Sequence, residues 1–366
     1  MKVCYAVVRL THGAGQTSTL REMVRAGEGT WTSEILCSQA DHEAIREFPS
    51  SVNVNVVPYV TSIVDDHTIG LMSDADIVHI KSGVPYFCTA LKIGRPSVYT
   101  LHQPDPTWLF GGRARVSRYI ADVAERPWLL SRATLVASVS PWIAEWYRKE
   151  RGLNSEVIPD IIDLSEFVPG SDSASRVPVE PRLLVVGDWD GPHGRKRTDE
   201  LVQIMPAVLT EFPQTHLTVA GLSEWAMNQL SGLTEAAGAQ DAIDLRGKVS
   251  RAELVKLYQS ATIYVCPSLV EGFYRPLIEA FACGLPAVVR EPPMSIPIPS
   301  RAPLLHLRAS GAGRTYDGSA HSLCMSIRFV LNHLAELSEA GRAYARCFTR
   351  EAVAPLLRSM YLKCLH

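Results

Sequence analysis

The 366-residue sequence has no C-x-x-C pair among its eight cysteines, which are scattered through apolar or helical segments. This spacing indicates neither a disulfide framework nor a zinc site, and it is typical of small core side chains in a reducing compartment. No run approaches 18 apolar residues, and the N-terminus lacks the cleavage pattern of a secretory signal. We therefore expect a cytoplasmic protein. A peripheral contact with the inner face of a membrane stays open.

The sequence also lacks an excess of either charge. Charged residues make up 20% of the chain, and the formal net charge is -2. A protein whose main partner is nucleic acid usually has a basic domain or a basic stripe, so we expect no nucleic acid partner. The length and the 46% content of hydrophobic residues predict a globular protein of two domains.

Short β-branched runs alternate with helical periodicity in both halves of the chain, which predicts parallel sheets covered by helices. The alternation stops at "VPGSDSASRVPVEP", a Pro/Ser-rich stretch that is typical of a linker. We predict an α/β protein with two Rossmann-like, doubly wound parallel-sheet domains. The predicted segments are a first domain at 1–165, a linker at 166–181, a second domain at 182–340, and a helical tail at 341–366 that packs back toward the first domain.

The stretch "CPSLVEGFYRPLIEAFACGLPAVV" has two glutamates, Glu271 and Glu279, in an otherwise apolar run. We predict a strand, a loop, and a helix that begins at Pro276 and ends before Gly284, with Glu279 in its first turn. Ligands of doubly wound sheets bind at the carboxyl ends of strands, and a helix N-terminus there attracts phosphate. Carboxylates accept hydrogen bonds from hydroxyl groups, so the segment suits a nucleotide sugar.

The E-x7-E spacing of these two glutamates resembles the donor-binding signature of retaining GT-B glycosyltransferases of the group 1 family (family 4-like). Other segments follow in that family's order, among them "SDADIVHIKSGVPYFCTALKIGRPSVYTLHQ" and "LLVVGDWDGPHGRKRTDELVQIM". The resemblance implies GT-B architecture, in which an acceptor-side N-terminal domain and a donor-binding C-terminal domain face each other across a cleft. It implies a retaining transfer of a hexosyl group from a nucleotide-diphosphate sugar to an acceptor hydroxyl on a glycolipid, a polysaccharide or a small molecule. No cofactor and no metal are expected.

The resemblance also assigns roles to single residues. It implies catalytic roles for Glu271 near the donor sugar, Lys196 facing the diphosphate and His102 beside the transferred sugar. The implied donor-binding and nucleotide-binding residues are Glu279, Gly272, Phe273, Tyr274, Arg195, Gly187, Gly13 and Gly15.

Three departures from the family pattern affect these assignments. Asp188 stands where the family has an arginine that pairs with the lysine on the diphosphate, and Arg195 and Arg197 are the nearby substitutes. Tyr274 replaces the glycine of the common "EGFG" pattern, and "PDIID" replaces the usual "PNGVD" turn.

Other interpretations stay open. Glu271 also fits a solvated loop residue, and His102 also fits a core histidine at the end of a strand. A non-catalytic nucleotide-sugar-binding subunit, or a phosphorylase or epimerase of the same fold, would share the donor half. The segment "TWLFGGRARVSRYI", with Arg113, Arg115 and Arg118, fits either an acceptor or lipid-headgroup loop or a partly exposed helix.

Overall fold

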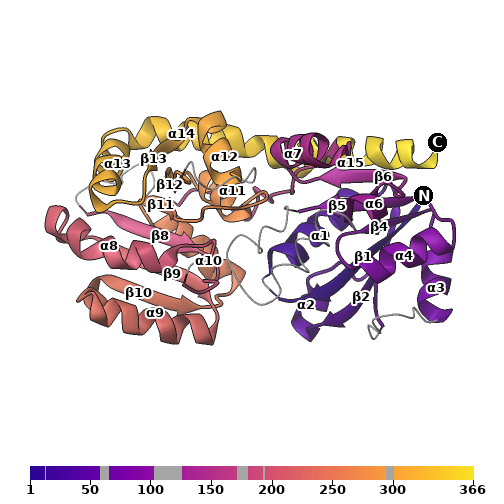
Figure 1. Cartoon of the computed structure of the whole chain (residues 1–366), viewed down its shortest axis with the longest axis horizontal. Helices are drawn as coiled ribbons and strands as arrows, with labels where there is room; N and C mark the ends of the chain where they lie inside the picture. Colours follow the sequence, from indigo (N-terminus) through magenta and orange to yellow (C-terminus); the bar gives the residue numbers. More distant parts are fainter. Residues whose placement is uncertain (13, 58–65, 103–125, 171–179, 193, 294–300) are drawn as a thin grey trace. The chain divides into compact units, whose positions relative to one another are not determined.

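The structure is a computed structural model that describes residues 1–12, 14–57, 66–102, 126–170, 180–192, 194–293 and 301–366 (Figure 1). The chain forms two compact units. Unit 1 comprises Met1–Ile161 and Phe348–His366, and unit 2 comprises Ile162–Cys347. Each unit is built around one parallel β-sheet, as the alternating sequence pattern predicts.

Unit 1 has a seven-stranded sheet with the order β3-β2-β1-β4-β5-β6-β7. The strands are β1 (Lys2–Leu10), β2 (Thr32–Ala40), β3 (Asn53–Val56), β4 (Ile77–Ile80), β5 (Ser97–Leu101), β6 (Leu135–Ser138) and β7 (Glu156–Val157). The helices are α1 (Gly15–Ala26), α2 (His42–Arg46), α3 (Asp66–Ser73), α4 (Val84–Lys92), α6 (Arg126–Leu130), α7 (Pro141–Arg151) and α15 (Arg350–Leu365). The neighbouring strands pair in parallel, which requires the helical crossovers between them.

Unit 2 has a six-stranded sheet with the order β10-β9-β8-β11-β12-β13. The strands are β8 (Arg182–Val186), β9 (His216–Leu222), β10 (Ile243–Gly247), β11 (Ile263–Cys266), β12 (Ala287–Arg290) and β13 (Gly313–Tyr316). The helices are α8 (Thr198–Glu211), α9 (Glu224–Ala236), α10 (Arg251–Ser260), α11 (Arg275–Ala282), α12 (Ala302–Ser310), α13 (Ala320–Asn332) and α14 (Leu334–Ala345), with short 3₁₀ segments η4 (Gln240–Ala242) and η5 (Arg346–Phe348).

Helices cover both faces of the unit 2 sheet. Leu183 and Val185 of β8 belong to a core cluster with side chains of α8, α9 and α13, while Leu184, on the opposite face, is also buried. Helices α11 and α12 both pack against α14 and form a second group. The sheet is therefore doubly wound, which confirms the predicted fold class.

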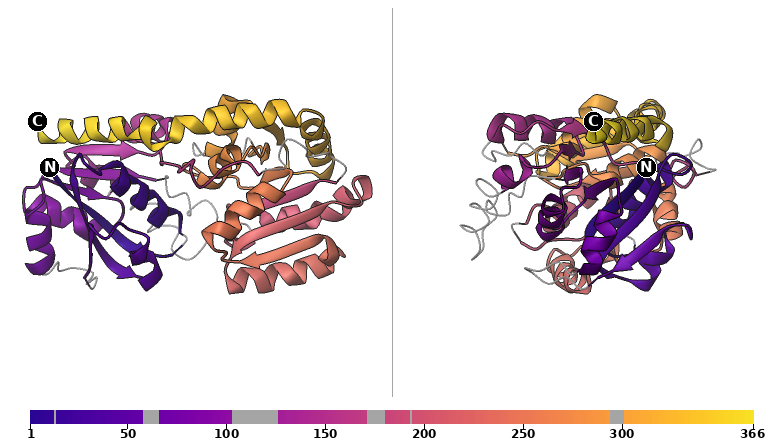
Figure 2. Two further views of the ribbon diagram at one scale, coloured as in Figure 1. Left: turned by 180° about the vertical axis from the view of Figure 1, so that it is seen from behind. Right: turned by 90° about the vertical axis from the view of Figure 1, so that its right-hand side faces the viewer.

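The C-terminal helix α15 belongs to unit 1, and it is drawn in yellow in Figure 2. Its fully buried Tyr361 packs in the same core cluster as β1 and β4. The Tyr361 hydroxyl lies 2.7 Å from His79 Nδ1 and 3.1 Å from the hydroxyl of Tyr5, and Tyr5 also accepts a hydrogen bond from Trp31 Nε1 at 3.2 Å. Burial lowers the pKa of His79 well below its usual value, so the ring is neutral in this network.

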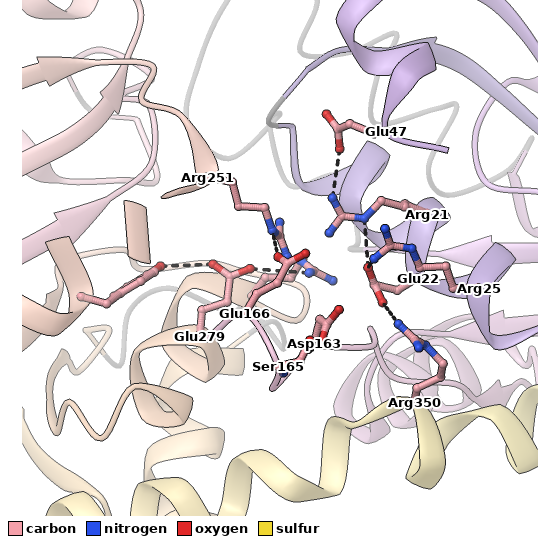
Figure 3. A network of polar contacts seen from close by, with 12 residues as sticks. Arg21, Glu22, Arg25, Glu47, Asp163, Ser165, Glu166, Arg251, Glu279 and Arg350 are labelled. Atoms are coloured by element: carbon pink, nitrogen blue, oxygen red, sulfur yellow. Dashed lines mark hydrogen bonds and ion pairs between the residues drawn. The ribbon is translucent and has the colours of Figure 1, made fainter. Parts of the chain in front are cut away.

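The start of α15 is held to α1 by buried charges. Glu22 of α1 is fully buried, and it accepts hydrogen bonds from Arg21 at 2.9 Å and from Arg350 of α15 at 2.9 Å (Figure 3). A second carboxylate, Glu47, lies 3.3 Å from Arg21. A buried carboxylate needs such partners, so Glu22 fixes the end of the chain where it returns to unit 1.

The unit boundaries differ from the predicted domain boundaries. The described part of the predicted linker, 166–170, belongs to unit 2. Phe167 is buried there, and its ring centroid lies 5.9 Å from that of Tyr258. The Val168 carbonyl accepts a hydrogen bond from Gln259 at 2.9 Å. At the other end, α14 stays with unit 2, and only residues from Phe348 onward belong to unit 1. In the "PDIID" segment, Asp163 Oδ1 accepts hydrogen bonds from the backbone and side chain of Ser165, which supplies turn chemistry in place of Asn-Gly.

The Tyr361 network generates a stability prediction. Tyr361→Phe removes the hydroxyl and leaves His79 Nδ1 and the Tyr5 hydroxyl with one partner fewer, so the free energy of unfolding of unit 1 should fall by about 1–3 kcal/mol. Denaturant unfolding followed by hydrogen exchange of β1 and β4 amides measures it. Leu362→Ala, at an exposed position of the same helix, is the control and should change little. Equal effects of the two variants would contradict the prediction.

Candidate functional site

The candidate site of unit 2 lies where the order of its strands reverses. From β8 the chain proceeds to β9 and β10 on one side of the sheet, and from β11 it proceeds to β12 and β13 on the other. The segments that follow β8 and β11 therefore meet at the carboxyl edge of the sheet, at its topological switch point. They are 187–197 after β8 and 267–274 after β11.

One carboxylate at this switch point contacts two cations. Glu271 Oε1 lies 2.5 Å from Lys196 Nζ and 2.8 Å from Arg195 Nη1. Glu271 is buried, whereas the side chains of Lys196 and Arg195 are 15% and 28% exposed. Burial acts to raise the pKa of Glu271, but attraction to Lys196 and Arg195 outweighs it and the pKa lies below its usual value. The site therefore holds an ionised carboxylate and two cations in contact.

The sequence prediction of no metal site overlooks an Asp-x-Asp pair, Asp188 and Asp190, directly after β8. In the structure these carboxylates accept hydrogen bonds from the backbone. Asp190 accepts from the N–H groups of Arg195 and Lys196, each at 3.1 Å, and so closes the loop that presents both cations. Within the part of the chain that the structure describes, no group of three or more His, Cys, Asp and Glu side chains is arranged to hold a metal ion.

Asp188, at the position of the family arginine, ties the same loop to the next helix. Its Oδ1 accepts hydrogen bonds from the N–H groups of Trp189 at 2.9 Å and Ser223 at 2.8 Å, and Ser223 is the N-cap of α9. The preceding Gly187 has φ +137°, and a Cβ there would lie 3.5 Å from Lys196 Nζ. Glycine therefore allows the sharp exit of the chain from β8 beside the lysine.

The structure separates the two candidate substitutes for the missing arginine. Arg195 contacts Glu271 beside Lys196, whereas Arg197 forms an ion pair with Glu200 at 3.0 Å and precedes α8 in a left-handed conformation with φ 51°. Arg195 is therefore the arginine that stands next to the lysine at the switch point.

Tyr274 keeps the backbone conformation that a glycine would adopt there. Its φ is 69°, a left-handed value that costs a non-glycine residue roughly 1–2 kcal/mol. The side chain is buried, its hydroxyl lies 2.8 Å from that of Tyr264, and Lys196 Nζ lies 5.2 Å from the centroid of its ring. These contacts offset the strain and place an aromatic face beside the lysine.

His306 of α12 supports this loop, and the sequence interpretation did not find it. Its Nε2 lies 2.8 Å from the carbonyl oxygen of Phe273, and its Nδ1 lies 2.9 Å from the hydroxyl of Tyr344. Burial lowers the pKa of His306 to about 3, so the imidazole is neutral. Its N–H donates to the Phe273 carbonyl and fixes the backbone at Gly272 and Phe273, both of which are buried. No motif could reveal His306, because its partner is 33 residues away in the sequence.

We expected Glu279 in the first turn of its helix. It lies beyond that turn, because α11 begins at Arg275 and not at Pro276. It is buried one turn further on, where Oε1 pairs with Arg275 at 3.5 Å and Oε2 accepts a hydrogen bond from Tyr258 at 3.2 Å. Figure 3 shows Glu279, and it also shows the ion pair that Arg251 forms with Glu166 in the same unit. The two glutamates of the E-x7-E pattern thus have separate partners in the described structure.

The remaining candidates belong to unit 1. Gly15 begins α1 after β1, and His102 follows β5. Burial and the positive charge of Lys81 lower the pKa of His102 to about 3, so the ring is neutral. Gly13 lies outside the described residues, as do Arg113, Arg115 and Arg118.

Comparison with known proteins identifies the class. The model of the family "Glycosyl transferases group 1" matches residues 182–296, and that of "Glycosyltransferase Family 4" matches residues 35–166. The chain is thus similar to group 1 glycosyltransferases in unit 2 and to Family 4 glycosyltransferases in unit 1.

The chain is similar to GDP-mannose:cellobiosyl-diphosphopolyprenol alpha-mannosyltransferase of Xanthomonas campestris, with 26% identity over 62% of this chain and 58% of that protein. It is also similar to D-inositol 3-phosphate glycosyltransferase of Mycobacterium sp. (strain JLS), with 29% identity over 36% of this chain and 31% of that protein. The chain thus spans less than two thirds of the length of these curated relatives.

Solved structures show the same fold. Sucrose-phosphate synthase from Thermosynechococcus elongatus matches with a TM-score of 0.76 and 19% identity, covering 99% of this chain and 98% of that one. Anabaena HepE in complex with UDP-glucose matches with a TM-score of 0.79 and 15% identity, covering 99% and 100%. These neighbours confirm the GT-B architecture of two doubly wound domains.

No helix in the described portion of the chain combines the length and the apolar character needed to cross a membrane.

The Asp190 contacts generate a prediction about the loop itself. Asp190→Ala removes the acceptor of the Arg195 and Lys196 amides, and hydrogen bonds to charged acceptors contribute about 1.5–3 kcal/mol. Amide hydrogen exchange at both positions should therefore accelerate by about tenfold or more. Asp241→Ala, at an exposed position of the same unit, is the control. Unchanged exchange at both amides in the Asp190 variant would show that the loop does not depend on this carboxylate.

Proposed function

We propose that this protein is a retaining hexosyltransferase, which transfers a hexosyl group from a nucleotide-diphosphate sugar to an acceptor hydroxyl. The proposal depends on one observation: Lys196 and Arg195 both form ion pairs with Glu271 at the switch point of unit 2. Two cations at the carboxyl edge of a doubly wound sheet suit a diphosphate, and a neighbouring ionised carboxylate suits sugar hydroxyls.

The proposed reaction needs stabilisation of a leaving group rather than a protein nucleophile. The bond between the anomeric carbon and the diphosphate oxygen breaks, and the acceptor oxygen bonds to the same face of the sugar. The acceptor proton passes to the departing diphosphate oxygen. Lys196 and Arg195 stabilise the negative charge that develops on the diphosphate, and their positions are fixed before the reaction by Asp190 and Glu271.

Glu271 is ionised and within reach of both cations, which supports a role in orienting the donor sugar. Retaining glycosidases instead use a carboxylate nucleophile next to an acid or base. Glu279 is engaged by Arg275 and Tyr258 and is proposed to bond the ribose of the donor. Gly187, Gly272, Phe273 and Tyr274 shape the backbone around the two loops, and His102 in unit 1 is proposed to lie beside the transferred sugar.

The names of relatives support the class of substrates. They contain GDP-mannose as a donor, and inositol 3-phosphate and a diphosphopolyprenol as further substrates. We propose a glycolipid, polysaccharide or small-molecule acceptor, a cytoplasmic location with access to the inner face of a membrane, and catalysis without a metal. A non-catalytic nucleotide-sugar-binding subunit is the alternative, and it would bind nucleotide without turnover.

The cations at the switch point generate the main kinetic prediction. Lys196→Ala and Arg195→Ala should each lower kcat by about 10²–10³, as expected for preorganised charge stabilisers. Arg197→Ala is the matched control, since its side chain pairs with Glu200, and it should stay near wild type. Release of nucleotide from a panel of UDP-, GDP-, ADP- and TDP-hexoses with acceptors measures turnover, and activity should survive EDTA. Normal turnover in the lysine variant, or reversible loss in EDTA, would refute this diphosphate site.

The two glutamates should respond differently to substitution. Glu279→Ala should weaken nucleotide binding by about tenfold, because a hydrogen bond to a charged group contributes about 1.5–3 kcal/mol. Glu271→Gln should depress kcat and leave nucleotide affinity nearly unchanged. Calorimetric titration with the nucleotide and steady-state kinetics separate the two effects. Equal and small effects of both substitutions would contradict the proposal that Glu279 binds the nucleotide and Glu271 orients the donor sugar.

A further inference from the structure

A second switch point lies in unit 1, between β1 and β4. Strands β2 and β3 continue the sheet on one side of β1, and strands β5 to β7 continue it on the other side of β4 (Figure 1). Lys81 follows β4 directly, and its N–H donates to the Ala6 carbonyl of β1 at 2.8 Å. The next residue, Ser82, accepts a hydrogen bond from the Val8 N–H at 3.0 Å. Lys81 therefore stands at the edge of the sheet where a doubly wound domain binds its ligand.

Lys81 is a buried cation that the described structure leaves incompletely compensated. The residue is only 5% exposed. Asp160 acts on it electrostatically, but the two groups do not form a salt bridge. Burial lowers the pKa of Lys81 to about 8 against the opposing effect of Asp160, so the amine is still mostly protonated at neutral pH. A buried ammonium group needs hydrogen-bond acceptors.

Two further groups near Lys81 suit the same kind of ligand. His102, at the end of the adjacent strand β5, has a buried Nε2 with no hydrogen-bond partner among the described residues. The ring of His102 forms a hydrogen bond with the backbone of Lys81, and the charge of Lys81 contributes to the lowered pKa of His102. Helix α4 begins at Val84, two residues after Ser82, and its free N–H groups give that end a partial positive charge.

We propose that Lys81, His102 and the start of α4 form an anion subsite in unit 1, which binds a phosphate group of the acceptor. A phosphate oxygen supplies the acceptor that the Lys81 ammonium needs. Because the N–H of the neutral His102 ring donates to the Lys81 backbone, Nε2 accepts a hydrogen bond from the P–OH of a singly protonated phosphate. Asp160 keeps the subsite from carrying the full charge of the lysine when it is empty. The inference rests on the proposed function only for the statement that the anion belongs to an acceptor.

The first test is direct binding. The protein is saturated with the nucleotide that stabilises it most, so that the diphosphate site of unit 2 is occupied. It is then titrated calorimetrically with inositol 3-phosphate and with unphosphorylated inositol. A second arm uses a diphosphopolyprenol-linked disaccharide in detergent micelles against the free disaccharide. Binding in either arm that depends on phosphate supports the subsite, and the arm that responds distinguishes a soluble acceptor from a lipid-linked one.

Lys81→Met tests the residue. It should weaken binding of the phosphorylated probe at least tenfold and leave nucleotide binding unchanged, and the latter shows that unit 2 remains folded. Lys92→Met, at an exposed position of α4, is the matched control and should bind as wild type. Should Lys81→Met fail to fold, the ¹³Cε resonance of Lys81 in the wild-type protein decides, since it should shift with the phosphorylated probe and not with the unphosphorylated one.

Equal affinity of wild type and Lys81→Met, equal weakening of phosphorylated and unphosphorylated probes, or no binding of any phosphorylated probe would overturn the subsite. Phosphate-dependent binding at Lys81 without hexosyl transfer from any donor would instead overturn the proposed function and leave the subsite intact.

Discussion

The contact of Glu271 with Lys196 and Arg195 is the interaction on which the candidate site depends. A carboxylate can be buried at the carboxyl edge of a sheet only if opposite charges compensate its lost hydration. This constraint accounts for the features around it. Asp190 closes the loop that carries both cations, Gly187 lets the chain leave β8 beside the lysine, and the carbonyl of Phe273 is held by a neutral histidine. The diphosphate of the proposed donor would join the same cations without a new arrangement of the loop, which is the form of preorganisation that lowers a reaction barrier.

Both units have charged side chains at the switch point of their sheet, but within the described residues these charges contact opposite charges directly only in unit 2. In unit 2 the switch point between β8 and β11 has two cations and an ionised carboxylate in contact. In unit 1 the switch point between β1 and β4 has a buried lysine with no direct salt-bridge partner in the described structure. A compensated set of charges is stable before ligand binding and exchanges partners when the ligand arrives. A cation that is only partly compensated, as Lys81 is by Asp160, instead gains further stabilisation from an anionic ligand, and this gives the ligand's own charge a share in recognition.

The sequence predicts the strands and the order of elements because β-branched runs in a parallel sheet are local signals. Strands β7 and β13 cannot be predicted in this way, since "EV" and "GRTY" have no such run and form strands by pairing with β6 and β12. In the site, the spacing of Glu271 and the basic loop could be read from the chain, and so could the loss of the family arginine at Asp188. The pairing of Glu279 with Tyr258, the support from His306 and the burial of Lys81 could not, because each depends on elements that only tertiary packing brings together. The Asp-x-Asp pair is the opposite case. The motif is visible in the sequence, but only the structure shows that its carboxylates accept hydrogen bonds from backbone N–H groups.

The substitutions that depart from the family pattern are mutually consistent in physical terms. An arginine at position 188 would bring a cation to the end of β8, whereas Asp188 brings an acceptor that joins the loop to the N-cap of α9. The loop so anchored returns through Asp190, and Arg195 reaches Glu271 from the far end of the same turn. Positive charge at the switch point is thus supplied by Arg195, seven residues further along the chain than Asp188. Tyr274 fits this arrangement, because its ring lies beside Lys196 and limits where the ammonium group can go. The departures therefore change which residues position the charges, while the charge itself stays at the edge of the sheet where the fold places a ligand.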